Sequence, residues 1–188
     1  MNDTPETPPV PPVTEALRAR AAQQRGGYLY AVDPYFDPDG AVPPYGIVGA
    51  WSVDDAGQLA GFTHNPKYRP SPVALEFPAP PTPLDAALQR AVTGYGSEAD
   101  LLAAFRDATL ILFAQEGPDI QGSLYTAENE DGAGRHIPAF THPDHLPDGW
   151  QHWQHVPGRH LAGLSMPVRL NPGARITLTI PAGALNAG

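Results

Sequence analysis

The chain has 188 residues, which is enough for one domain or for one domain with an appended subdomain. Its formal net charge of −9 argues against nucleic acid and against anionic membrane surfaces as partners, and leaves basic proteins open. The absence of cysteine excludes disulfides, thiolate zinc sites and cysteine nucleophiles, and favours a reducing compartment.

The N-terminal residues are not typical of an export signal. Residues 1–13, MNDTPETPPVPPV, lack the basic and apolar regions of a signal peptide. Their prolines predict a disordered tail with polyproline II character, and a docking motif at residues 8–12 is the alternative. No apolar run in the sequence approaches about 18 residues, so no membrane insertion is expected. We therefore expect a cytoplasmic protein.

Residues 14–77 predict a small subdomain built from a helix, a strand and a hairpin. Thr14 can cap a helix that ends at the two glycines of positions 26 and 27. Residues 28–32, YLYAV, are typical of a strand. Two apolar runs, 47–53 and 59–62, are joined by an Asp/Gly turn and predict a β-hairpin. The prolines that follow fix the exit of the chain, because each one restricts its own backbone and that of its predecessor.

Residues 82–188 predict helices followed by strands. Thr82 with Asp85, and Ser97 with Asp100, have the spacing of helix caps, and apolar residues follow each pair at helical intervals. A short apolar run at 109–114 predicts a buried strand. Residues 123–127 and 135–140 predict a strand pair, 158–164 a short helix, and 168–180 a closing hairpin. This order predicts an α+β fold, with a mixed β-sheet and helices packed mainly on one side.

Several motifs in the chain resemble one group of bacterial proteins. PPYGIVGAW, the D-D-x-G turn, FTHNPKYRPSP and PTPLDAALQRAVTGYG are similar to the type VII secretion system-associated proteins of actinobacteria. The later HIPAFTHP and LNPG segments resemble the SseB-type domain that is often joined to them. The resemblance spans roughly residues 26–182. It implies an SseB-like domain at 82–188, in a secretion context that supplies no catalytic residues. Together with the composition, this gives a disordered tail at 1–13 and a Pro-rich hairpin subdomain at 14–77 before that domain.

The histidines are the first place to look for chemistry. His142 with His145, and His152 with His155, form two H-x-x-H pairs, so a metal site is a hypothesis. Nearby prolines predict a loop for the first pair. The second pair lies in a segment expected to be extended, where residues three apart point to opposite faces. A histidine-dependent metalloprotein, or a pH sensor, is kept as the third functional hypothesis, and no metal or other cofactor is expected.

The sequence lacks the common catalytic motifs. It contains no G-x-S-x-G, P-loop or Rossmann pattern. The acidic residues gather in turns, where we expect them to be solvated. We therefore do not expect a pair of catalytic carboxylates. We expect a protein that is not an enzyme.

Aromatic residues near the hairpin and the histidine-rich loop supply the expected partner surface. Proline-stiffened loops that present aromatic side chains lose little entropy on binding. The leading hypothesis is an adaptor that binds a type VII substrate or a component of the secretion machine. The alternative is an immunity protein, because strong acidity suits a basic toxin. The candidate surface residues are Tyr45, Trp51, Phe62, Tyr68, Trp150 and Trp153.

Overall fold

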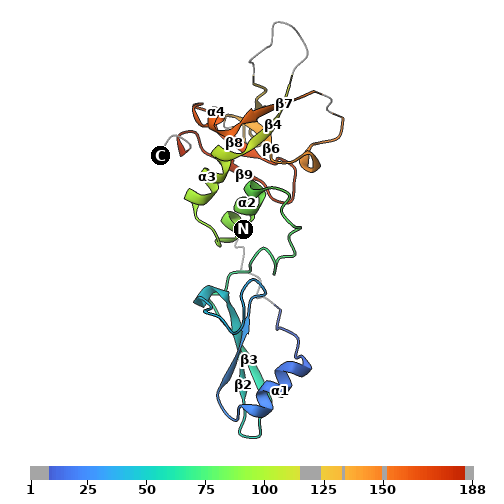
Figure 1. Ribbon diagram of the computed structural model, residues 1–188, viewed down its shortest axis with the longest axis vertical. Coiled ribbons are helices and arrows are strands. Elements are labelled where there is room, and N and C mark those ends of the chain that lie inside the picture. The colour runs from blue at the N-terminus through green and yellow to red at the C-terminus, as the bar shows by residue number, and fades with distance from the viewer. Residues whose placement is uncertain (1–8, 115–123, 133, 150–151, 185–188) are drawn as a thin grey trace. The chain divides into compact units, whose positions relative to one another are not determined.

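The structure, a computed structural model, describes residues 9–114, 124–132, 134–149 and 152–184 (Figure 1). The chain divides into two compact units, residues 1–77 and 78–188. Each unit has a β-sheet and a hydrophobic cluster of its own. Within the described ranges no helix is both long and apolar enough to cross a membrane.

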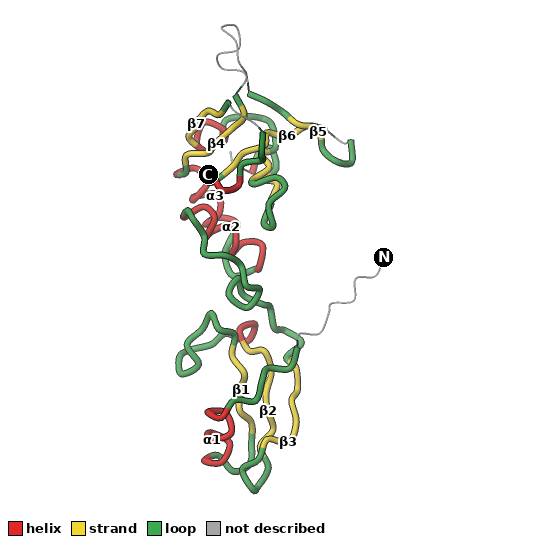
Figure 2. The backbone as a smooth tube through the Cα atoms, turned by 90° about the vertical axis from the view of Figure 1, so that its right-hand side faces the viewer, coloured by secondary structure: helices red, strands yellow, loops and turns green. Residues whose placement is uncertain are grey.

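The first unit is a three-stranded antiparallel sheet with a helix on one face (Figure 2). The strand order is β1-β2-β3, which confirms the predicted strand and hairpin. The helix begins after Thr14, whose hydroxyl accepts a hydrogen bond from the Leu17 backbone N–H at 3.2 Å, as the sequence predicts. The elements are α1 (Glu15–Gln23), β1 (Tyr28–Val32), β2 (Ile47–Val53) and β3 (Leu59–His64).

The hairpin turn between β2 and β3 is held by one aspartate. Asp54 Oδ1 accepts hydrogen bonds from the backbone N–H groups of Ala56 and Gln58 at 2.9 and 2.7 Å. Gly57 has a φ of 78°, which glycine adopts at little cost. These local bonds explain why the Asp/Gly turn could be predicted from sequence.

In the second unit, the described residues form a six-stranded mixed sheet and three α-helices. The main path runs β7-β4-β6-β8-β9, and β5 pairs with β6. Strands β6 and β8 are parallel, and the other neighbouring strands are antiparallel. This arrangement confirms the α+β fold class. The strands are β4 (Thr109–Phe113), β5 (Ala127–Glu128), β6 (Arg135–Phe140), β7 (Trp153–Pro157), β8 (Val168–Leu170) and β9 (Leu178–Ile180). The helices are α2 (Pro83–Thr93), α3 (Glu98–Asp107) and α4 (Gly158–Ala162).

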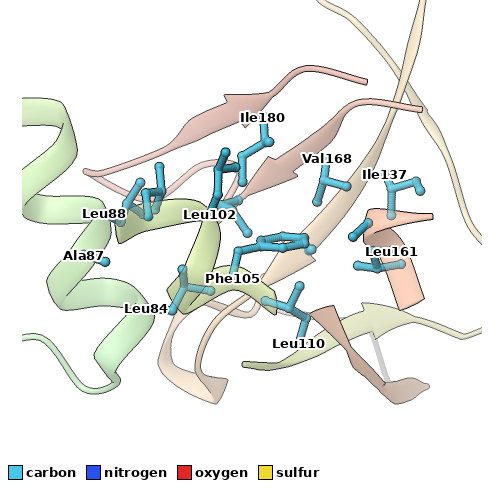
Figure 3. Close-up of a cluster of buried hydrophobic side chains, with 14 of the residues drawn as sticks. Leu84, Ala87, Leu88, Leu102, Phe105, Leu110, Ile137, Leu161, Val168 and Ile180 are labelled. Carbon is cyan, nitrogen blue, oxygen red and sulfur yellow. The ribbon is translucent and has the colours of Figure 1, made fainter. Parts of the chain in front are cut away.

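The main core lies between these helices and one face of the six-stranded sheet (Figure 3). Phe105 of α3 is fully buried and lies among leucines of α2 and α4. On the sheet side, alternate residues such as Leu110, Ile137 and Val168 belong to the same cluster. Burying each such side chain stabilises the fold by about 1.5–3 kcal/mol. The opposite face of this sheet carries a smaller aromatic cluster that includes Phe113 and Phe140.

Candidate functional site

The face of the first sheet opposite α1 carries two exposed tyrosines. Side chains alternate along β1, so Leu29 is buried in the cluster under α1 while Tyr28 and Tyr30 project from the other face. The two tyrosine residues are 60% and 65% exposed. Their cross-strand partners in β2 are Ser52 and Ala50, which are too small to cover the rings. An apolar, aromatic sheet surface therefore faces solvent.

A shallow groove of about 490 Å³ lies on this surface and draws residues from all three strands. None of the eight described residues that line it is charged, although the chain carries a net charge of −9. The hydroxyl groups of Tyr28, Tyr30 and Thr63 make no hydrogen bond within the described part of the chain, so they are free to bind a ligand. We name this surface the tyrosine face, defined by Tyr28, Tyr30, Pro44, Ile47, Gly49, Ala50, Thr63 and Asn65.

Hydrogen bonds from one side chain fix the rim of the tyrosine face. Asn65 Nδ2 donates to the carbonyl oxygens of Pro44 and Ile47, both at 2.7 Å. Its Oδ1 accepts from the Lys67 backbone N–H at 3.0 Å. Pro44 also begins a 3-10 turn, Pro44–Gly46, that leads into β2. The groove is therefore held in shape before any partner binds, which lowers the entropy cost of binding.

A buried aspartate anchors the loop that follows β1. Asp33 is fully buried, and its Oδ1 accepts from the Tyr35 backbone N–H at 2.9 Å. Its Oδ2 accepts from the Tyr68 hydroxyl at 2.8 Å and from the Ser71 backbone N–H at 3.0 Å. Because three donors bind this carboxylate, it holds the loop in place.

A second candidate site surrounds a buried carboxylate in the other unit. Asp85, in the first turn of α2, is 4% exposed. Its Oδ1 accepts from Thr141 Oγ1 at 2.6 Å and from Asn171 Nδ2 at 3.2 Å, and its Oδ2 accepts from Thr82 Oγ1 at 2.6 Å. Thr141 and Asn171 each follow one of the parallel strands β6 and β8. The network thus ties the start of α2 to the carboxyl ends of two strands.

A pocket of about 230 Å³ lies beside this network. His145 Nε2 lies 3.3 Å from Asp85 Oδ1 and makes no hydrogen bond with any residue that the structure describes. The pocket is lined by Pro78, Pro81, Asp85, Leu88, Gln89, His145, Asn171, Ala174, Arg175 and Ile176.

The structure brings one of the two predicted histidine pairs together. His142 caps a 3-10 turn, Pro143–His145, which ends at His145, and the two ring centroids are 6.5 Å apart. Both residues lie in the connection between β6 and β7, where the first pair was expected in a loop, and Pro143 takes the first position of the short turn. His155 lies in the extended strand β7, as expected, and His152 directly precedes that strand. Among the described residues no three histidine, aspartate or glutamate side chains are placed to hold a metal ion.

His136 of β6 is the histidine with the clearest electrostatic signature. The loss of hydration on burial lowers its pKa, the charge of Arg169 lowers it further, and Glu130 acts in the opposite direction. Its Nδ1 lies 2.7 Å from Asn129 Oδ1, which suits a neutral ring that donates from Nδ1.

We expect this histidine to make the protein less stable in mild acid. The unfolded chain binds the imidazole proton near the ordinary histidine pKa of about 6.5, whereas the folded chain binds it at lower pH. Stability should therefore fall as the pH drops from about 7 through 6.5 towards the folded-state pKa. Urea unfolding at several pH values should show a weaker pH dependence for His136→Gln than for wild type. The exposed His160→Gln should keep the wild-type dependence, and equal curves for all three would contradict the assignment.

The aromatic residues predicted as a partner surface in the first unit are all half-buried. Trp51 and Phe62 contact each other with ring centroids 4.9 Å apart. Tyr45 contacts Phe36 at 6.1 Å between centroids. Tyr68 donates its hydroxyl to the buried aspartate of the β1 loop. The role of these four residues in partner binding stays a prediction.

In the second unit, Trp153 stacks on Phe113 with centroids 4.9 Å apart, and Trp150 lies outside the described residues. The two most exposed tyrosines, Tyr28 and Tyr30, were not among the predicted surface residues. The signal that could have found them is their i, i+2 spacing around Leu29, which places both rings on one face of a strand.

Comparisons with known proteins identify the second unit. Residues 84–187, more than half of the chain, match the SseB protein N-terminal domain. The curated proteins contain no match to this sequence. The solved structures contain no match either. The matched range begins in the first turn of α2 and extends beyond β9, so it contains all six strands of the mixed sheet. By this match, the chain belongs to the SseB family.

Proposed function

We propose that this protein is a cytoplasmic, non-enzymatic adaptor of an actinobacterial type VII secretion system. In this role it binds a secreted substrate or a component of the machine through the tyrosine face. The observation that carries the proposal is the pair of tyrosines, Tyr28 and Tyr30, exposed on the uncovered side of the first sheet.

Several properties of the surface support a role in binding. Tyrosine is enriched among the residues that dominate interface energies, because its ring is large and has few rotatable bonds. The Asn65 hydrogen bonds hold the rim in place, so little ordering is needed on association. The motifs of residues 41–72 and the SseB domain support the secretion context.

We expect loss of the two tyrosines to abolish partner binding without harming the fold. The double variant Tyr28→Ser/Tyr30→Ser removes exposed rings, so its stability should stay within about 0.5 kcal/mol of wild type. Affinity capture from the producing bacterium, read by mass spectrometry, should recover at least about tenfold less of a specific secretion substrate or machine component with the double variant than with wild type. Tyr35→Ser is the matched control, because Tyr35 is 46% exposed and lies outside the tyrosine face. Unchanged capture by the double variant would reject the tyrosine face as the binding surface.

A second candidate function is immunity to a basic toxin, which the net charge of −9 favours. Opposite charges speed the encounter of an inhibitor with its target. Salt screens this attraction, so binding should weaken as the salt concentration rises. Co-expression with a toxin encoded nearby should rescue growth if this function is correct. If the toxin still kills the cells when both proteins are expressed at matched levels, the immunity function is rejected.

A further inference from the structure

We propose that the tyrosine face binds an uncharged, proline-rich segment of its partner in the polyproline II conformation. This inference rests on the interaction role proposed above and names the chemistry of the partner segment. Three observations support it: the neutral lining of the groove, the spacing and hydroxyl groups of its tyrosines, and a second groove of the same unit that is lined by prolines of the chain itself.

The charge of the groove selects an uncharged occupant. All eight residues of the tyrosine face are neutral. A charged side chain buried there would lose hydration without gaining an ionic partner, which costs more than the burial returns. An acidic segment would also be repelled by the net charge of −9. A segment of prolines and small apolar residues carries none of these costs.

The spacing of the tyrosines fits an extended segment of chain, because about two extended residues span the distance between their rings. Tyr28 and Tyr30 are two residues apart on one strand, so their side chains emerge roughly 7 Å apart. A polyproline II helix advances about 3.1 Å per residue, so about two of its residues fit between the rings. The floor between the rings includes Ala50, the cross-strand partner of Tyr30, whose small side chain leaves room for a second backbone. Aromatic-lined grooves of this kind are a general recognition mode for such helices.

The hydroxyl groups on the tyrosine face match the polar atoms of the proposed occupant. A polyproline II backbone makes no internal hydrogen bonds, so its carbonyl oxygens need outside donors. The hydroxyls of Tyr28, Tyr30 and Thr63 are donors without a partner in the described part of the chain. A bound α-helix would offer few free carbonyls to these hydroxyls, because its own backbone consumes them.

The same unit already places prolines of its own chain beside an apolar groove. Pro9, Pro11 and Pro12 line a second groove, of about 520 Å³, together with residues of β1, β2 and the loops around them. Tyr68 is on its wall. In this second groove, a proline-rich stretch of the chain therefore already lies beside a tyrosine, as we propose for the partner segment on the tyrosine face.

The test uses the full chain and a decaproline peptide, followed by ¹⁵N NMR. Decaproline should shift the backbone amide signals of Tyr30, Ala50 and Thr63, and a ten-residue Gly-Ser peptide should not. Tyr28→Ser/Tyr30→Ser should weaken decaproline binding at least about tenfold, and Tyr35→Ser should change it less than about twofold.

Three results would overturn the inference. The first is the absence of decaproline shifts on the tyrosine face at millimolar peptide. The second is equal affinity of the double variant and wild type. The third is a shift pattern confined to the outer edge of β3, at Phe62 and His64, which would indicate strand addition. If decaproline fails while partner capture still depends on the two tyrosines, the adaptor role stands and only the proline-rich partner is wrong. If capture is also independent of them, both proposals fall.

Discussion

Replacing Gly158 by alanine is expected to destabilise the SseB unit by about 3 kcal/mol or more. Gly158 is the first residue of α4, and its N–H donates to the Ala108 carbonyl at 2.8 Å. A Cβ at this position would overlap the carbonyl oxygen of Phe105. Both contacts are to backbone at the end of α3, and the Phe105 side chain is fully buried, so no flexible group can move aside. The close approach of α3 and α4 requires glycine.

Gly163→Ala is the matched control for this substitution. Gly163 is exposed, has an ordinary negative φ of −76°, and lies at the end of the same helix. A Cβ there would make one contact at 3.8 Å, which is a normal van der Waals distance. Urea unfolding should show Gly163→Ala at or slightly above wild-type stability, because alanine restricts the unfolded chain. Equal stability of the two variants would contradict the packing described for α3 and α4.

Asp85→Ala is expected to cost about 2–4 kcal/mol of the free energy of unfolding. The substitution removes the acceptor for Thr82, Thr141 and Asn171, two of which are buried, and leaves their donors without a full set of partners. The cost arises from desolvated donors more than from the lost bonds themselves. Chemical denaturation followed by circular dichroism measures it.

Asp107→Ala provides the comparison for Asp85. Asp107 is an exposed carboxylate at the last position of α3, where a negative charge faces the unfavourable end of the helix dipole. Its removal should change stability by no more than about 0.5 kcal/mol. If Asp85→Ala were as mild as Asp107→Ala, the buried network would not hold α2 to the sheet.

Local signals explain which parts of the fold could be predicted from sequence. Ser97 and Asp100 form a complete capping box at the start of α3, and the pattern needs no tertiary context. The hairpin turn is likewise held by Asp54 and its near neighbours. Thr82 caps α2 as predicted, accepting from the Asp85 N–H at 3.1 Å. The Asp85 carboxylate, however, binds hydroxyl and amide groups 56 and 86 residues away, which no local pattern reveals.

The tyrosine face could be predicted only in part. The YLYAV strand places Tyr28 and Tyr30 on one side and Leu29 on the other. Which side remains open depends on where α1 packs. That helix contributes only Leu17 and Ala21 to the cluster on the sheet, a stripe too thin to predict its docking. The prediction of Trp51 and the other aromatic residues as a partner surface therefore rested on residue type alone, because the sequence does not show which face of the sheet α1 covers.

Site-specific photo-crosslinking in the producing bacterium tests the interaction surface most directly. A photoreactive phenylalanine analogue placed at Tyr30 should crosslink to a discrete secretion substrate or machine component. The same analogue placed at Tyr35, outside the tyrosine face, should not. Crosslinks of equal yield at both positions, or none at Tyr30 in a folded protein, would contradict the assignment of the tyrosine face as the binding surface.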